Sequence, residues 1–499
     1  MVYSGYQDGL DVNPVIIETN IRKGIPRNTI TGQADFSVKE SMDRIRVALE
    51  SGGFVFPLQN IVINLSPADL KKKGSQFDLP IAISILLATT QIESGFIDFK
   101  TVILGEIGLD SKIHPVKGFI NLLIKLKEAG FKKFIVPHEN CKEGSVVSGI
   151  DLFPISRLYD IKYSLKSNIP VTRAQDLQKI RVLPEISLYE NQLVAFRALV
   201  VSVTGRHHMM LIGSPGSGKT KLIKLARLLQ PDMDQEEVAE LLRIESLKNS
   251  SISYSNIELQ RPFRSPHHTS SEVSIVGGGN QIQMGEITMA HQGILFLDEL
   301  GEFKPRVIQA LREPMEEQRI TISRANYRAT YPASFLLLCA TNPCPCGYHR
   351  DRAATCVCSS GKIKNYISRF NGPFLDRIEM MVELYGGENK NKKSISLNKI
   401  KEDIQQAIGR QRIRFAHNSS VKFNGNIKYY EDDLLDISHS SRKLIHSLQE
   451  NMSLRRLFSL KKISRTIADL AHSEQIENIH VYEALQYCSS ISESYFVKK

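Results

Sequence analysis

A glycine-rich segment that ends in a lysine and a hydroxyl residue is typical of phosphate binding. It consists of Gly213, Ser214, Pro215, Gly216, Ser217, Gly218, Lys219 and Thr220. An apolar run over residues 209–212 precedes it and a helical pattern over 222–229 follows. Glycines let successive backbone N–H groups turn toward one anion, and the helix adds its positive N-terminal end. The context favours a phosphate loop over an ordinary glycine-rich turn, with Lys219 on the outer phosphates of ATP and Thr220 on Mg²⁺.

Polar side chains follow two further apolar runs. Residues 293–297 lead into Asp298 and Glu299, and residues 335–340 lead through Thr341 into Asn342. Such runs are typical of buried parallel strands, whose carboxyl ends meet at one edge of the sheet. We expect Asp298 to hold Mg²⁺, Glu299 to activate water, and Asn342 to orient that water beside the γ-phosphate.

Four of the seven cysteines lie within fifteen residues: Cys344, Cys346, Cys356 and Cys358. Four thiolates on a polar loop would suit a structural Zn²⁺, although the one-residue spacing within each pair is tighter than usual. Reduced thiols that pack the loop are the alternative. An odd number of crowded cysteines indicates a reducing compartment and not a disulfide framework.

Composition indicates a globular protein of about three domains, since 499 residues exceed what one core usually serves. The hydrophobic fraction is 42%, and no apolar run approaches the roughly 18 residues of a membrane span. The N-terminus lacks the basic and apolar regions of a signal peptide, so we expect a cytoplasmic protein. The net charge of +11 suits a polyanion such as nucleic acid.

The elements that must position these residues divide the chain into parts. Residues 1–165 mix strand patterns, at 15–21 and 61–65, with a helical pattern at 37–49. Polar residues 166–184 are typical of a linker, and residues 185–387 form the α/β nucleotide module with its parallel sheet. An exposed hinge at 386–393 leads into a helical lid at 388–499, which has helical patterns at 463–472 and 480–487.

Almost the whole chain resembles the ComM family, the competence-associated AAA+ ATPases related to the ATPase subunit of magnesium chelatase. The segments that carry the resemblance are VKESMDRIR at 38–46, GSQFDLP at 74–80, RPFRSPHH at 261–268, GGG at 277–279, ALREPM at 310–315, NPCPCG at 342–347 and FLDR at 374–377. The resemblance implies a homo-oligomeric ring, expected to be a hexamer. It also implies that the partner is DNA, branched or single-stranded, and that the activity is branch migration during natural transformation.

Ring assembly gives a chemical role to Arg377, because a guanidinium supplied by a neighbouring subunit stabilises the charge that develops during γ-phosphoryl transfer. The alternative is an arginine that pairs with a nearby carboxylate such as Asp376 or Glu379. On the lid, we expect Arg465 to sense the γ-phosphate. Lys462 stands where related chains often carry arginine, which leaves the choice between Arg465 and Lys462 open.

The N-terminal part resembles the proteolytic domain of Lon, most clearly in GEIGLDSKIHPVKG at 105–118. Lon uses a Ser–Lys dyad. In this chain Gln76 falls near the nucleophile position and Ile120 near the lysine position, so neither group is present. A neighbouring Ser75 or Lys117 would point elsewhere, and catalytic geometry tolerates little displacement. The resemblance therefore implies an α+β domain that is catalytically dead, with an active peptidase as the alternative.

Contact with the substrate is expected from residues 265–284, which include His267, His268 and three consecutive glycines. This segment would project into a central channel, with Arg261, Arg264 and Arg324 sharing the contacts; a flexible loop is the alternative. A metal-insertion ATPase like magnesium chelatase, a protein-remodelling machine and a pure binding scaffold remain alternative functions.

Overall fold

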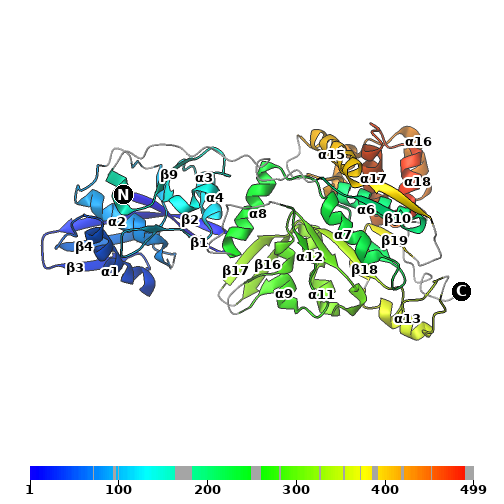
Figure 1. Ribbon diagram of the computed structural model, residues 1–499, viewed down its shortest axis with the longest axis horizontal. Coiled ribbons are helices and arrows are strands. Elements are labelled where there is room, and N and C mark those ends of the chain that lie inside the picture. Colours follow the sequence, from blue (N-terminus) through cyan, green and yellow to red (C-terminus); the bar gives the residue numbers. More distant parts are fainter. Residues whose placement is uncertain are drawn as a thin grey trace. The chain divides into compact units, whose positions relative to one another are not determined.

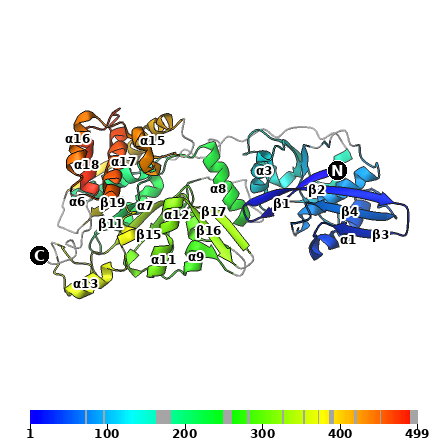
Figure 2. The ribbon, with the colours of Figure 1, turned by 180° about the vertical axis from the view of Figure 1, so that it is seen from behind.

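A computed structural model of the chain describes most of its residues (Figures 1 and 2). The described residues are 1–70, 72, 74–93, 97–98, 100–162, 182–248, 260–279, 283–324, 327–351, 354–370, 372–384, 391–416, 421–450 and 452–488. Most of the linker expected at 166–184 and of the hinge expected at 386–393 lies outside them, as do residues 280–282 and the side chain of Arg324. The chain divides into two compact units: residues 1–179 with 233–259, and residues 180–232 with 260–499.

A seven-stranded sheet forms the first unit, in the order β3-β4-β2-β1-β5-β8-β9. Its strands are β1 (Val2–Asp8), β2 (Asp11–Arg22), β3 (Arg27–Thr31), β4 (Asn60–Ser66), β5 (Thr101–Ile103), β8 (Lys133–Pro137) and β9 (Asp151–Ile155). β2 is antiparallel to β1 and β4, and the remaining pairs are parallel. Alternate residues of β4 are apolar and buried, as half-buried strands require. β2 and β4 contain the two strand patterns at 15–21 and 61–65.

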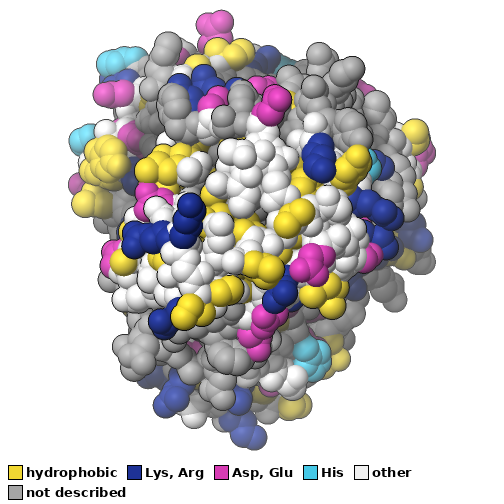
Figure 3. Space-filling view, turned by 90° about the vertical axis from the view of Figure 1, so that its left-hand side faces the viewer, with side chains coloured by type: hydrophobic (Ala, Val, Ile, Leu, Met, Phe, Trp, Pro, Cys, Tyr) yellow, Lys and Arg dark blue, Asp and Glu magenta, His cyan; other side chains and the backbone are white. Residues whose placement is uncertain are grey.

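Helices α1 (Phe36–Ser51), α2 (Asp78–Ala88), α3 (Phe119–Glu128) and α4 (Cys141–Gly144) accompany this sheet, with a small hairpin of β6 (Glu106–Ile107) and β7 (Ile113–His114). α1 contains the helical pattern at 37–49 and begins at a cap, where the Asp35 side chain accepts from the Val38 N–H. On the face of this unit in Figure 3, acidic and basic side chains are interspersed with apolar ones. The chain's positive charge is therefore not gathered into one block on that face.

Helix α8 (Gln235–Lys248) belongs to the first unit, although its residues lie within the span expected for the nucleotide module. Val238, Leu241 and Leu242 are buried in the same apolar cluster as α3. Arg243 Nη2 donates to the Leu10 carbonyl at 3.0 Å. The pattern of an amphipathic helix shows that it buries one face, but not against which partner.

The second unit contains a five-stranded sheet in the order β12-β15-β18-β11-β19, with every pair parallel. Its strands are β11 (Met209–Ile212), β12 (Phe263–Arg264), β15 (Ile294–Leu297), β18 (Leu336–Thr341) and β19 (Met380–Glu383). Every residue of β11, β15 and β18 is buried, which explains their unbroken apolar sequences. This is the parallel sheet expected for the nucleotide module.

The remaining elements of this unit follow in chain order. They are β10 (Glu185–Tyr189), α6 (Glu190–Gly205), α7 (Lys219–Leu229), α9 (Glu272–Val276), β13 (Gly277–Gly278), β14 (Gln283–Met284), α10 (Glu286–Met289), α11 (Pro305–Ala310), α12 (Arg312–Glu317), β16 (Arg319–Arg324), β17 (Tyr327–Pro332), α13 (Ser360–Ile367), α14 (Gly372–Leu375), β20 (Lys392–Ser396), α15 (Leu397–Arg414), α16 (His439–Ser447), α17 (Leu454–Leu470) and α18 (Asn478–Tyr487).

One hydrophobic cluster runs from the parallel sheet through α6 and α7 into the C-terminal helices. β20 pairs antiparallel with β10, so the segment before the phosphate loop is tied to the start of the C-terminal part. The C-terminal helices and the sheet therefore share a core. Among the residues that the structure describes, none of the helices combines the length and apolar character needed to cross a membrane.

Candidate active site

The polar tips of three parallel strands meet at one edge of the second sheet. Ile212 of β11 is paired with Thr341 of β18, and Leu297 of β15 is paired with Cys339 of the same strand. Gly213, Asn342 and Asp298 each follow one of these strands directly. The parallel register brings the glycine-rich segment, the acidic pair and the amide to one edge, as their order in the sequence predicts.

Lys219 lies across the loop that precedes it. Its Nζ donates to the carbonyls of Gly213, at 2.7 Å, and Ser214, at 2.9 Å, and to Asn342 Oδ1 at 3.1 Å. Burial lowers the pKa of this ammonium to about 8, while the charges of Asp298 and Glu299 act in the opposite direction. Lys219 is thus a nearly buried cation at the meeting point of β11 and β18.

The loop backbone requires its glycines. A Cβ on Gly213 would lie 1.7 Å from the Leu384 carbonyl oxygen, and Gly218 has φ +96°, a left-handed conformation that side chains disfavour. The buried hydroxyl of Ser217 has no hydrogen-bond partner among the described residues. A phosphate oxygen would satisfy it, so the loop fits the anion that the sequence predicts.

Asp298 and Thr220 lie close enough to share a cation. Thr220 Oγ1 donates to Asp298 Oδ2 at 2.9 Å, and the Glu299 N–H donates to Asp298 Oδ1 at 3.1 Å. A hydroxyl and a carboxylate in contact are oxygen ligands of the kind that Mg²⁺ takes together with substrate phosphates. Glu299 itself has φ +51° and a side chain that is 61% exposed. Its Oε2 lies 3.6 Å from His268 Nδ1.

Arg377 contacts a carboxylate that the sequence did not indicate. Its Nη2 lies 2.7 Å from Glu316 Oε2, and Arg455 Nη2 lies 2.9 Å from the other oxygen of Glu316. Although partial burial raises the pKa of Glu316, hydrogen bonds from the two arginines hold it below its ordinary value. Arg455 was missed because its partner lies 139 residues earlier in the chain.

The two arginines line a cavity of about 510 Å³ together with Lys428, Phe458 and Lys462. Arg377 Nη1 donates to the Pro373 carbonyl, and its buried Nε has no hydrogen-bond partner among the described residues. Arg377 is two residues before Glu379, which precedes β19, whereas the phosphate loop follows the carboxyl end of the adjacent β11. The two therefore lie at opposite ends of the sheet in the same chain.

Arg465 contacts residues at the end of its own helix, and among the described residues no contact joins it to the phosphate loop; its expected role as a sensor of the γ-phosphate stays a prediction. Its side chain is fully buried in α17, where Nη1 donates to the Glu474 carbonyl at 2.6 Å and Nη2 to that of Ser473 at 2.7 Å. Nη2 also lies 3.0 Å from Asp469 Oδ1. Through these contacts the guanidinium binds backbone carbonyls that follow the C-terminal end of its own helix.

Lys462 is also buried and belongs to a network at the amino end of the sheet. Its Nζ pairs with Glu379 and donates to the Gly425 carbonyl at 3.0 Å. The other Glu379 oxygen is 2.8 Å from His207 Nδ1. Burial would raise the pKa of Glu379, but Lys462 and His207 hold it well below its ordinary value. This network joins α17 to the start of β19, away from the phosphate loop.

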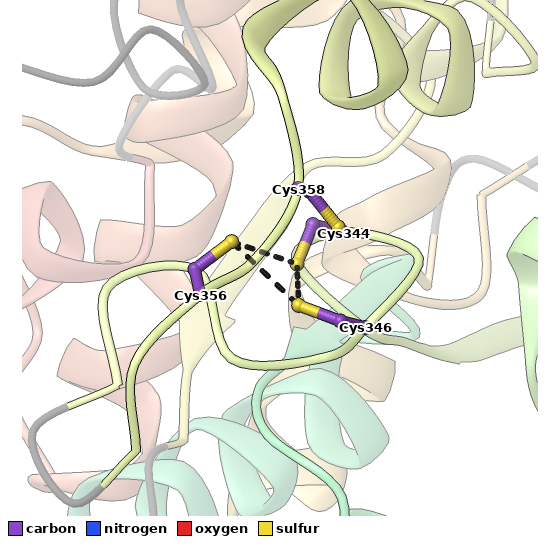
Figure 4. Close-up of side chains that lie close together, drawn as sticks. All are labelled: Cys344, Cys346, Cys356 and Cys358. Atoms are coloured by element: carbon purple, nitrogen blue, oxygen red, sulfur yellow. Dashed lines mark hydrogen bonds between the residues drawn. The ribbon is translucent and has the colours of Figure 1, made fainter.

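The four clustered cysteines point toward one another (Figure 4). Sγ of Cys344 lies 3.3 Å from that of Cys346 and 3.7 Å from that of Cys356, and Cys346 and Cys356 are 3.6 Å apart. The sulfur of Cys358 completes the set, and all four sulfurs lie within 4.8 Å of one another. A tetrahedral zinc site with Zn–S bonds of about 2.3 Å has sulfurs roughly 3.8 Å apart, so this donor set fits Zn²⁺.

The cysteine cluster contacts the nucleotide loop and its neighbours. A Cβ on Gly347 would lie 2.5 Å from Pro215 Cδ. Helix α13 packs on the cysteines through Ile363 and Ile367. From the same segment, Tyr366 Oη lies 3.1 Å from Thr341 Oγ1, and Arg369 Nη1 donates to the Gly301 carbonyl at 2.6 Å. The segment that contains the cysteine cluster therefore contacts the turns that carry the candidate site residues.

Two residues of the first unit, Gln76 and Ile120, were assigned to dyad positions by the resemblance to Lon. Gln76 is in the short 3₁₀ helix Ser75–Phe77, and Ile120 is fully buried in α3. An aliphatic side chain in a packed helix has no group that can act as a base.

A parallel α/β sheet with a phosphate loop, an acidic strand tip and an amide at the next tip defines an AAA+ ATPase. The nucleotide module matches the family described as "Magnesium chelatase, subunit ChlI" over residues 186–392. Residues 17–140 match "Subunit ChlI of Mg-chelatase", and residues 395–488 match "Magnesium chelatase, subunit ChlI C-terminal".

Relatives extend the match to nearly the whole chain. The competence protein ComM of Haemophilus influenzae is 33% identical over 98% of this chain and 97% of its own length. The YifB protein of Salmonella typhimurium is 34% identical over 96% of this chain and 95% of its own. A probable DNA helicase, MCM9 of Oryza sativa subsp. indica, is 23% identical over 42% of this chain and 26% of its own. The chain belongs to the ComM/YifB family.

Proposed function

We propose that this protein is a ring-forming ATPase that uses ATP to remodel DNA. The proposed reaction is branch migration during natural transformation and recombination. The main support for ATP hydrolysis is the contact between Thr220 and Asp298, because it brings two Mg²⁺ ligands together beside Lys219. The DNA part is supported by the competence protein and the probable DNA helicase among its relatives.

Each residue of the site has a role in this proposal. The loop Gly213–Thr220 holds the phosphates, Lys219 neutralises them, and Thr220 with Asp298 holds Mg²⁺. Glu299 accepts the proton of the attacking water, and Asn342 orients that water. Arg377 enters the site of a neighbouring subunit, which agrees with its distance from its own phosphate loop. The assembly is a cytoplasmic homo-oligomer, a hexamer.

The domain roles belong to the same proposal. Residues 1–165 form a catalytically dead, Lon-like domain, residues 166–184 a linker, residues 185–387 the AAA+ domain, and residues 388–499 a helical lid. A metal-insertion ATPase of the magnesium chelatase type is the second candidate, favoured by the matches of all three parts of the chain to that subunit. ATPase activity that requires partner subunits and a porphyrin would favour this second function.

DNA binding is expected to weaken steeply with salt. If the ring encloses duplex DNA through phosphate contacts, each neutralised phosphate releases counterions, and the logarithm of the affinity falls with the logarithm of salt by about 0.9 per contact. Titrations of labelled linear and four-way DNA at several salt concentrations measure this slope.

Branched DNA is expected to raise ATP turnover above the rate with linear duplex, and ATP is expected to drive branch movement.

Peptide and porphyrin are the matched comparisons in the same turnover assay. Salt-insensitive binding, or a branch point that moves equally with and without ATP, would contradict the proposal of DNA remodelling. The proposal of ATP hydrolysis would be unaffected. Turnover stimulated by peptide alone would instead favour a protein-remodelling machine.

We also propose that the cysteine cluster binds one structural Zn²⁺. Cys344, Cys346, Cys356 and Cys358 would hold it, and the metal would fix the turn whose Gly347 contacts Pro215. Metal analysis of protein purified without chelator is expected to show about one zinc per chain. Replacing both Cys344 and Cys356 by Ser is expected to lose the zinc and weaken nucleotide binding as well.

Cys141→Ala is the control, since this cysteine lies in the first unit and its thiol contacts the Pro137 carbonyl. Zinc content and nucleotide affinity should be unchanged in this variant. A metal-free preparation that binds ATP normally would show that the thiols only pack the loop.

A further inference from the structure

An open groove lies along α7, the helix that begins at the phosphate loop. It has a volume of about 820 Å³ and starts at Thr220, the expected Mg²⁺ ligand. Its walls come from α7 and from β12, which is the strand at one edge of the parallel sheet. We call it the α7 groove, and its other residues are Lys221, Lys224, Leu225, Arg227, Leu228 and Phe263.

The α7 groove has an apolar floor and a basic rim. Lys221, Lys224 and Arg227 follow one another at intervals of three residues, so they lie along one side of the helix, and all three are exposed. Leu225 and Leu228 are half-buried beside them. An apolar floor inside a cationic rim is complementary to an acidic surface that also carries an aromatic side chain.

A turn in the C-terminal part of the chain has this complementary character. The 3₁₀ segment Tyr429–Leu435, which we call the acidic turn, contains three consecutive acidic residues. Its Tyr430 is 76% exposed, and Asp433 is exposed as well. The turn is anchored to α17, because Asp432 forms an ion pair of 2.6 Å with Lys461. It therefore presents an aromatic ring and a carboxylate on a fixed backbone.

The acidic turn lies on the side of the second unit that carries Arg377. Tyr429 lines the same cavity as Arg377, and Arg377 precedes β19, the strand at the edge of the sheet opposite β12. In a closed ring of identical subunits the contacts are head to tail, so opposite sides of the subunit meet. An Arg377 that enters the neighbour's site brings the acidic turn toward the neighbour's phosphate loop, where the α7 groove begins.

We propose that the acidic turn of one subunit binds in the α7 groove of the next. Tyr430 packs on the apolar floor, and Asp433 faces the rim at Lys224. Because α7 begins at the phosphate loop, a turn bound along it holds Arg377 at a fixed distance from the neighbour's phosphates. The inference rests on the ring and on the role of Arg377 between subunits in the proposed function, and it is independent of DNA as the substrate.

The experiment measures assembly by sedimentation velocity over a range of protein concentrations, with Mg²⁺ and a non-hydrolysable ATP analogue. Lys224→Glu and Asp433→Lys are each expected to raise the concentration for half-assembly about three- to tenfold, because each places like charges across the contact. The double variant restores opposite charges, and its assembly should return to within about twofold of the parent. Tyr430→Ala, which removes the aromatic anchor, should weaken assembly about tenfold or more.

Lys443→Glu is the matched control, because it makes the same charge change at an exposed position of α16. It should assemble like the parent, and all variants should bind the ATP analogue, which verifies their fold. Single variants at the contact that assemble like the parent overturn the inference, as does a double variant weaker than either charge variant. Normal assembly of Lys224→Glu with a loss of DNA affinity would also overturn it and assign the groove to nucleic acid. A parent protein that stays monomeric at every concentration would contradict the ring of the proposed function as well.

Discussion

Glu299→Gln is expected to bind ATP with near-normal affinity and to hydrolyse it about 10² to 10⁴ times more slowly, the usual cost of losing a general base. The phosphates and Mg²⁺ keep their partners, because Lys219 donates to Asn342 and Thr220 donates to Asp298, and the Glu299 carboxylate takes no part in these hydrogen bonds. Binding of a fluorescent ATP analogue and steady-state phosphate release separate the two effects. Near-normal turnover would remove Glu299 from the role of base.

Glu302→Gln provides the matched control, since it removes an exposed carboxylate from the same turn at a position 3.9 Å from Arg369. Its turnover should stay close to that of the parent protein. Lys219→Ala gives the opposite contrast. It removes the buried cation that lies between the loop carbonyls and Asn342, and ATP binding itself should be lost.

The strand tips could be predicted from sequence because each step of that argument is local. An unbroken apolar run of four to six residues indicates a buried parallel strand, and the polar residue that follows is placed by the end of the run. Asp298 and Asn342 were located in this way and Lys219 from the glycine-rich motif, and the structure brings them to one edge. The roles of these residues in hydrolysis remain predictions.

Partners far apart in sequence could not be predicted. Nothing in the residues around Arg377 indicates Glu316 or Arg455, because the three belong to segments far apart in sequence that meet through these ion pairs. The surroundings of Arg465 could not be predicted either, since its donors bind two carbonyls just beyond its own helix. Its role as a sensor of the γ-phosphate stays a prediction. The partner of α8 was hidden for the same reason.

Arg377→Ala is expected to abolish turnover of the homogeneous ring while leaving ATP bound, because an arginine supplied by a neighbour contributes about 10³ to 10⁵ in kcat. Glu299→Gln is expected to be inactive for a different reason, since its site is dead but its Arg377 is intact. Mixing the two inactive variants tests action between subunits. In a randomly mixed ring, roughly one quarter of the head-to-tail interfaces would join an intact site to an intact arginine.

Recovery of about that share of activity on mixing is the expected result, measured as phosphate release after joint refolding or subunit exchange. An arginine that acts within its own chain would give no recovery at any ratio. Glu316→Gln separates this role from a structural one, because it weakens the hold on Arg377 and Arg455 but removes neither guanidinium. It should keep most of the turnover; a loss as large as that of Arg377→Ala would show that Arg377 serves to anchor Glu316. Arg319→Ala, which breaks an exposed pair with Glu317, controls for loss of a nearby arginine and should mix like the parent.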